Sequence, residues 1–76
     1  MWEKLYIRFN SGDVLERYVY CRDTYDLYAV IGYIYSTSIN KIDRISDEIV
    51  SKDKVEEDKV FSLKGRVWDE SKYTLL

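Results

Sequence analysis

The side chains that most often carry out chemistry in proteins are scarce in this sequence. Histidine is absent and Cys21 is the only cysteine. Nucleophilic catalysis pairs a serine, cysteine or threonine with a base, most often histidine, and zinc, copper and iron sites rely on histidine and cysteine ligands. Cys21 falls on the inward face of an expected strand, where a small buried hydrophobic residue is the expected role. The sequence therefore predicts a protein that is not an enzyme and that binds no metal or cofactor.

Carboxylates are the one reactive group present in number. Residues 43–58, which we call the acidic segment, carry seven acidic side chains against three basic ones. The acidic segment contains no glycine, which a calcium-binding loop needs at its centre. Its open interpretations are a solvated loop, an acidic contact surface for a basic partner, and a metal site, in that order of preference. The residues that would make such a contact are Asp47, Glu48, Glu56, Glu57 and Asp58.

Eight tyrosines make aromatic surface the least ordinary feature of the chain. Side chains alternate between the two faces of a strand, so if Leu5 and Ile7 face the core, Tyr6 emerges on the opposite face. That face suits a protein interface. The alternatives are rings that pair across strands to shield a small sheet, and stacking of single-stranded nucleic acid, for which Lys4 and Arg8 lie in phase. This predicted aromatic face consists of Trp2, Tyr6, Tyr18 and Tyr20.

Length, composition and charge limit the class of protein. Seventy-six residues suffice for one domain, and 46% apolar with 34% charged residues is a globular balance. The net charge of −2 argues against non-specific binding of nucleic-acid phosphates. Domains of this size often need a disulfide, a metal or a partner subunit for stability, and only self-association is left here. We expect a single domain over residues 1–76, located in the cytoplasm because we find no signal peptide or membrane span.

The elements that position these side chains follow from periodicity. Residues 2–9 alternate as a half-buried strand, and the turn at residues 10–13 joins them to a second strand at residues 14–21. Asp23 is suited to cap a helix that begins near Thr24, with Asp26 three residues later as a loose capping box. One apolar stripe, with tyrosines on both of its flanks, runs along this helix, which is expected to end at Ser36-Thr37-Ser38.

The second half of the chain is less regular. Residues 41–45 are rich in β-branched side chains and predict a short strand, although their isoleucines recur every three residues. Residues 46–58 predict a long loop or a short helical insertion, residues 59–68 a last strand, and residues 69–76 a tail. Truncating Ile31 should cost more stability than truncating Tyr18. The predicted core is Leu5, Ile7, Phe9, Val19, Leu27, Ile31 and Ile34.

The order strand, strand, helix, strand, strand predicts an α+β fold with a small, mainly antiparallel sheet and one helix packed on one face. Residues 5–45, with the turn Ser11-Gly12-Asp13, the Asp-capped helix and the run Lys41-Ile42-Asp43-Arg44-Ile45, resemble small ββαβ proteins of low-GC Gram-positive bacteria and their phages. Some phage proteins of this build inhibit host defence or repair enzymes, so the resemblance implies a role of that class. It carries no functional residue over to this chain.

These observations together predict a non-enzymatic protein-protein interaction module, such as a phage-type inhibitor of a host defence or nucleic-acid enzyme. It would act by occluding a site, or by partial DNA mimicry in which carboxylates of the acidic segment stand in for phosphates. One alternative is a domain that binds single-stranded nucleic acid through the aromatic face. The other is a structural homodimer of unknown role.

Overall fold

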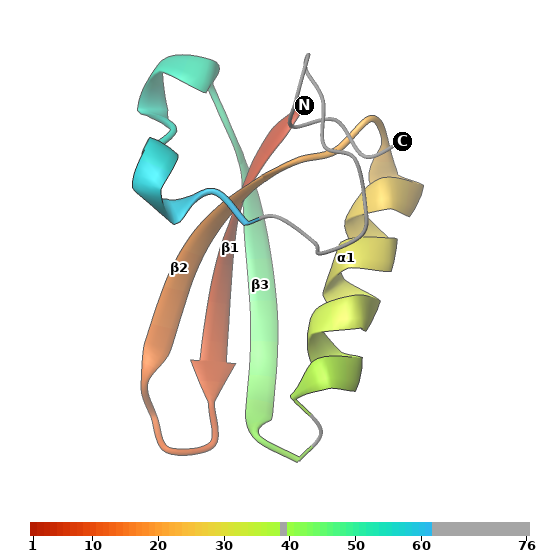
Figure 1. The fold of residues 1–76 in the computed structure, drawn as a ribbon, viewed down its shortest axis with the longest axis vertical. Coiled ribbons are helices and arrows are strands. Elements are labelled where there is room, and N and C mark those ends of the chain that lie inside the picture. The colour runs from red at the N-terminus through yellow and green to blue at the C-terminus, as the bar shows by residue number, and fades with distance from the viewer. Residues whose placement is uncertain (39, 62–76) are drawn as a thin grey trace.

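A computed structural model describes residues 1–38 and 40–61 of the chain. Three antiparallel strands form one sheet in the order β2-β1-β3, and an α-helix packs against it (Figure 1). This arrangement confirms an α+β fold. None of the helices in these ranges has the length and apolar character needed to cross a membrane. The elements are β1 (Trp2–Phe9), β2 (Val14–Tyr20), α1 (Thr24–Thr37), β3 (Ile42–Val50) and two short 3-10 helices, η1 (Lys52–Lys54) and η2 (Glu57–Lys59).

The β1–β2 hairpin forms where alternation predicts it. Trp2 pairs with Tyr20 at its open end. At its closed end the Phe9 N–H donates to the Asp13 carbonyl at 2.9 Å, and the Gly12 N–H donates to the Phe9 carbonyl at 2.9 Å. Gly12 has a φ of +96°, a conformation that side chains with a Cβ rarely adopt. Glycine therefore permits this tight connection.

Helix α1 starts at the predicted cap. The Asp23 carboxylate accepts the Asp26 N–H at 2.9 Å. Asp26 in turn accepts the Arg22 backbone N–H at 2.9 Å and the Arg22 guanidinium at 2.9 and 3.2 Å. The predicted capping box is therefore present, but its return bond reaches the residue before the cap. The helix ends at Thr37, inside the predicted stop.

The cap makes a measurable contribution to stability. We expect Asp23→Ala to lower the free energy of unfolding by about 1 kcal/mol, because the Asp26 N–H loses its acceptor at the helix start. Chemical denaturation followed by circular dichroism measures the change. Asp58→Ala, which removes an exposed carboxylate elsewhere, serves as the control. An equal loss in both variants would contradict a specific role for the cap.

The core lies between α1 and the sheet. Of the residues predicted for it, Phe9 and Ile31 are half-buried at its edge, and the others are buried. Cys21 is buried with them, as predicted, and burial raises the pKa of its thiol to about 12. The thiol is therefore protonated at neutral pH. The buried cluster is Leu5, Ile7, Val19, Cys21, Leu27, Val30 and Ile34.

Strand β3 is longer than predicted. It spans nine residues, so residues 46–50, predicted as the start of a loop, continue the strand and pair with β1. The pairing shifts between Arg8 and Phe9, where Phe9 faces Ile42 and Arg8 faces Arg44. This irregularity lets Ile42 and Ile45, three residues apart, both pack against the core. It also explains an isoleucine spacing that a regular strand does not fit.

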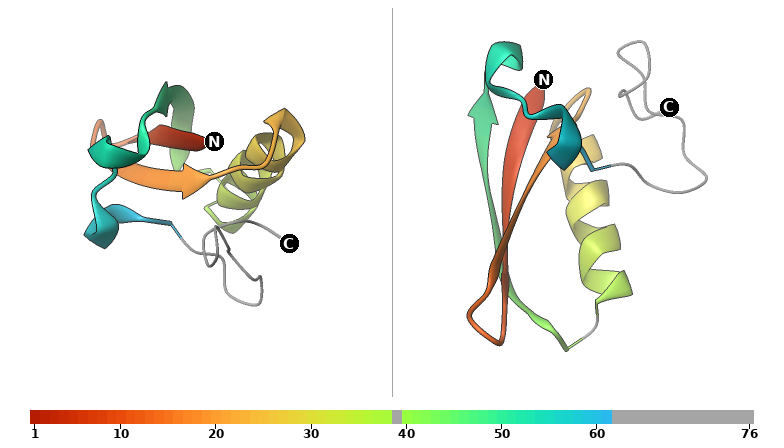
Figure 2. Two further views of the ribbon diagram at one scale, coloured as in Figure 1. Left: turned by 90° about the horizontal axis from the view of Figure 1, so that it is seen from above. Right: turned by 60° about the vertical axis from the view of Figure 1, so that its left-hand side comes forward.

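After β3 the chain crosses to the outer side of β2. The predicted helical insertion consists of η1 and η2, and Val60 then forms a parallel bridge with Tyr18. Figure 2 shows residues 51–61 running on the β2 side of the sheet. The predicted last strand at residues 59–68 lies mostly outside the described residues, as does the whole predicted tail. The predicted order of five elements is therefore not confirmed.

Candidate interaction surface

The predicted aromatic face is one side of the sheet, but its rings are not all open to solvent. Trp2 and Tyr18 are only 5% and 4% exposed, while Tyr6 and Tyr20 are half-buried. Trp2 packs edge-on against Tyr20, with 5.4 Å between the ring centroids. The shared face of these rings is as predicted, and the cross-strand contact of Trp2 with Tyr20 fits the alternative in which the rings shield the sheet. Whether any of them contacts a partner stays a prediction.

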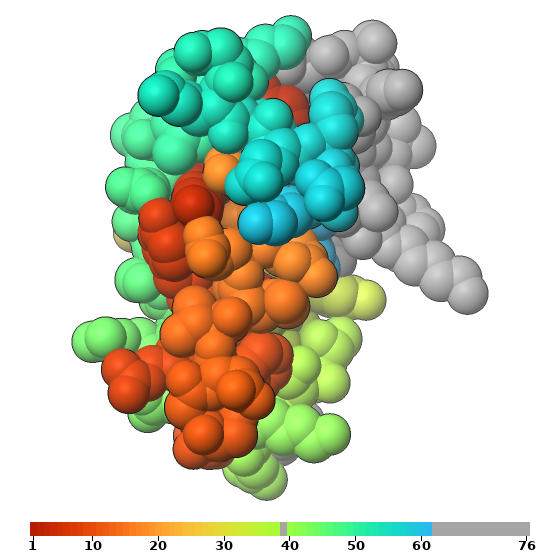
Figure 3. All heavy atoms as spheres, turned by 90° about the vertical axis from the view of Figure 1, so that its left-hand side faces the viewer, coloured from red at the N-terminus to blue at the C-terminus, as the bar shows by residue number. Residues whose placement is uncertain are grey.

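Tyr18 is buried because residues 51–61 lie against β2 (Figure 3). Its carbonyl accepts the Phe61 N–H at 2.7 Å, and its hydroxyl donates to the Glu56 carboxylate at 3.3 Å. The available signal in the sequence was the pair of apolar residues Val55 and Val60 among the charges, and both are half-buried. Their spacing alone does not say which face of the sheet the segment covers.

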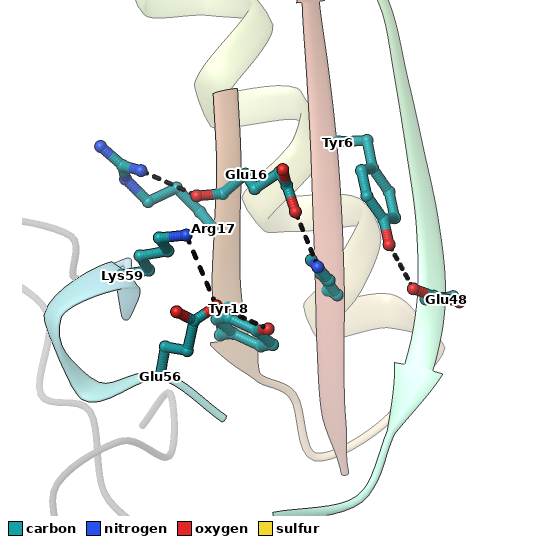
Figure 4. A network of polar contacts seen from close by, with 8 residues as sticks. Tyr6, Glu16, Arg17, Tyr18, Glu48, Glu56 and Lys59 are labelled. Carbon is teal, nitrogen blue, oxygen red and sulfur yellow. Dashed lines mark hydrogen bonds and ion pairs between the residues drawn. The ribbon is translucent and has the colours of Figure 1, made fainter. Parts of the chain in front are cut away.

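Lys4 lies at the centre of a polar network on this outer face, and Figure 4 labels other members of the network, among them Tyr6, Glu16 and Glu48. Its ammonium binds Glu16 at 2.7 Å and lies 5.1 and 5.5 Å from the ring centroids of Tyr6 and Tyr18. The Tyr6 hydroxyl donates to Glu48. These hydrogen bonds raise the pKa of Lys4, lower the pKa of Glu16 and raise the pKa of Tyr6. Each shift moves the pKa of the group further from pH 7, whereas acid-base catalysis needs a pKa near the working pH.

The five carboxylates predicted to form one contact surface are divided between different places. Asp47 and Glu48 are adjacent on β3, so their side chains leave opposite faces of the sheet. Glu48 joins the outer network through Tyr6, whereas Asp47 interacts with Glu3 on the helix side. Glu56 contacts the Tyr18 hydroxyl and binds Lys59 at 3.4 Å. The exposed members on η2 are Glu57 and Asp58.

Glu3 carries a buried carboxyl and is not among the candidate residues that the sequence indicates. It is 1% exposed, and its Oε1 has no hydrogen-bond partner in residues 1–38 and 40–61. Burial, the hydrogen bond with Asp47 and the charge of Asp47 raise the pKa of Glu3, while the amino terminus of Met1 acts in the opposite direction. The signal was its position two residues before Leu5, in phase with the core face. Its charge made an inward orientation unexpected.

Several exposed side chains of α1 and β3 lie toward the outer edge of β3. The Ile45 N–H donates to the Tyr35 hydroxyl at 3.1 Å, which places Tyr35 at the outer edge of β3. Tyr28 lies two turns earlier on the same side of the helix and is 64% exposed. Ile49 is 72% exposed and pairs with Glu3, so it points to the same side of the sheet. We call Tyr28, Tyr35, Asp47 and Ile49 the β3 margin.

The other helix tyrosines point elsewhere, as the helical period predicts. Tyr33 lines a hollow of about 360 Å³ on the β2 side, together with Leu15, Arg17 and Phe61. Tyr25 is 82% exposed and faces away from the sheet. The β3 margin is therefore the place where exposed tyrosines adjoin a strand edge.

Comparison of the chain with protein-family models, with curated proteins and with solved structures finds no match. Within residues 1–38 and 40–61, no three His, Cys, Asp or Glu side chains gather as a metal site would require.

Proposed function

We propose that this protein is a non-catalytic protein-binding module whose contact surface is the β3 margin. The observation that carries the proposal is the outer edge of β3, which pairs with no other strand among the described residues and lies beside exposed Tyr28, Tyr35 and Ile49. Tyrosine is enriched at the energetic centres of protein interfaces, and strand edges bind extended segments of partner proteins. An aromatic patch next to an open edge combines both features.

The state of the ionisable side chains supports binding rather than catalysis. The Cys21 thiol is buried with a pKa of about 12, so it is not a nucleophile at neutral pH. Lys4 and Glu16 neutralise each other across the hairpin. Because the ammonium of Lys4 is engaged in this way, and Trp2 and Tyr18 are buried, stacking of single-stranded nucleic acid on this face receives little support.

Occlusion of a site on a larger protein is the role that we propose for such a module. More specifically, we propose that the larger protein is a host defence or nucleic-acid enzyme, which the module inhibits. Partial DNA mimicry receives less support than occlusion, because Asp47 and Glu48 leave opposite faces of the sheet and Glu56 is engaged by Lys59. A second copy of the chain is the alternative occupant of the surface.

The test compares two variants that remove exposed side chains. We expect the double variant Tyr28→Ser/Ile49→Ser to lose at least about tenfold of its affinity for the partner captured by the wild-type protein, as for a hot spot worth about 1.4 kcal/mol or more. The matched control is Tyr25→Ser, which removes a more exposed tyrosine that faces away from the sheet. Affinity capture from the source cells, followed by titration with the purified partner, measures both.

The control outcomes separate the alternatives. Circular dichroism should show that all variants retain the fold, because the substituted side chains are exposed. Equal retention of the partner by the double variant and by Tyr25→Ser would refute the β3 margin as the contact surface. Light scattering that shows a wild-type dimer and a monomeric double variant would identify the occupant as a second copy.

A further inference from the structure

Part of the outer edge of β3 has backbone groups without partners among the described residues. The Ile45 N–H donates to Tyr35 rather than to β1. Backbone groups point to alternate sides along a strand, so the N–H and C=O groups of Asp47 and Ile49 point outward as well. Apart from the pairing of β3 with β1, no backbone hydrogen bond to these groups occurs within residues 1–38 and 40–61. As far as the described part of the chain goes, the stretch from Asp47 to Ile49 therefore has no strand on its outer side.

An unsatisfied carboxyl lies beside this stretch. Glu3 is buried, no described residue gives its Oε1 a hydrogen bond, and its carboxyl interacts with that of the exposed Asp47 on β3. A buried acceptor without a partner is costly, and a second carboxylate next to it adds repulsion when both are ionised. A positive charge placed at this pair would relieve both costs. The arrangement therefore points to a cationic ligand group.

We propose that the β3 edge at Asp47–Ile49 binds an extended basic segment of a partner protein, which adds as a strand and places a lysine or arginine against the Glu3–Asp47 carboxyl pair. This inference rests on the proposed function and names the chemistry of its partner.

Neighbouring side chains define the rest of this partner. The Tyr35 hydroxyl occupies the Ile45 N–H and so limits the open edge to the end of β3 near Ile49. Side chains two residues before and after the basic one lie on the same face and would meet exposed Tyr28 and Ile49, which favours apolar residues at those positions. A second copy fits less well, because its β3 would bring its own Asp47 and neighbouring acids toward the same carboxyl pair.

The probe for this inference is a capped synthetic peptide, Thr-Val-Thr-Lys-Thr-Val-Thr, titrated into the full chain while the backbone amides are followed by NMR. We expect the amide signals of Asp47 and Ile49 to shift and saturate while that of Asp58 stays in place. Asp47→Asn should weaken binding by about tenfold, as expected for the loss of one charge-assisted contact. Asp58→Asn, the same change on η2, should leave the affinity unchanged.

Two altered peptides test the pairing and the charge separately. The peptide with glutamate in place of lysine should not bind, and the peptide N-methylated at alternate residues should not bind because it cannot pair with the edge. Binding of either one as tightly as the parent peptide would overturn the inference. So would concentration-dependent shifts of the Asp47 and Ile49 amides in the protein alone, which would assign the edge to a second copy.

The outcome also distinguishes this inference from the proposed function. If the peptide leaves the β3 edge unperturbed while Tyr28→Ser/Ile49→Ser still loses its partner, the inference is wrong and the proposed function stands. If that double variant keeps its partner, the proposed function itself is wrong.

Discussion

Replacing Tyr18 with alanine should destabilise the protein by about 3–5 kcal/mol, as much as truncating a large side chain in the core. Tyr18 lies on the outer face of the sheet but is nearly inaccessible to solvent. Its ring faces the Lys4 ammonium, its hydroxyl reaches Glu56, and its backbone pairs with the chain at Val60. Alanine would leave a cavity between β2 and the segment that covers it. Such a loss is comparable to the whole stability of many small domains.

The stabilities of three further variants, measured by chemical denaturation, provide the comparison for Tyr18→Ala. Leu5→Ala, in the completely buried part of the core, sets the scale for a severe loss. Tyr18→Phe keeps the ring and should cost much less, because the hydrogen bond to Glu56 is long at 3.3 Å. Tyr25→Ala removes an exposed ring and should have little effect. A mild effect of Tyr18→Ala would mean that residues 51–61 do not cover this face in solution.

Glu3→Gln should raise the free energy of unfolding at neutral pH, by about 1 kcal/mol or more. Burial first, and then the hydrogen bond and charge of Asp47, raise the pKa of Glu3 above its ordinary value of 4.5. The folded protein therefore carries either an energetically costly charge or a proton that the unfolded chain would release. Glutamine has the same shape, carries no charge and can donate a hydrogen bond to Asp47. The substitution removes the electrostatic cost with little change in packing.

The pH dependence gives the sharper measurement. Because the pKa of Glu3 is raised on folding, its contribution is most favourable below the ordinary pKa. That contribution is lost as the pH rises from there through the raised value. The wild-type protein should thus lose stability relative to Glu3→Gln across this interval, and the difference should level off above it. Glu48→Gln, on the exposed outer face, is the control. A difference between wild type and Glu3→Gln that does not vary with pH would show that Glu3 has no raised pKa.

The local parts of the fold could be predicted from the sequence. The alternation of β1 and the turn at Gly12 specify a hairpin, and the carboxylate of Asp23 specifies a helix start, because each depends on residues close together in the chain. The core followed from the same periodicities. The length of β3 did not, since its pairing with β1 includes a shift at Arg8 and Phe9 that breaks the period of two.

The candidate site was less predictable than the fold. Strand phase placed Tyr18 on the correct face, but only the packing of residues 51–61 decides that this face is covered. Tyr18 is therefore more buried than Ile31, and we now expect its truncation to be severe as well. The burial of Glu3 follows from phase and was obscured by its charge. The position of β3 at the edge of the described sheet depends on the order of strands, which local patterns do not specify.

The bridge between Tyr18 and Val60 has a consequence for the order in which the chain folds. Contacts between residues far apart in the chain require a large loop to close before they stabilise anything, so they form late. The β1–β2 hairpin and α1 are built from near neighbours and can form while the rest of the chain is still being synthesised. Tyr18 therefore stays open to water until residue 60 has emerged. During that interval the growing chain presents an aromatic surface that the finished protein hides, and chaperones or aggregation partners can reach it only then.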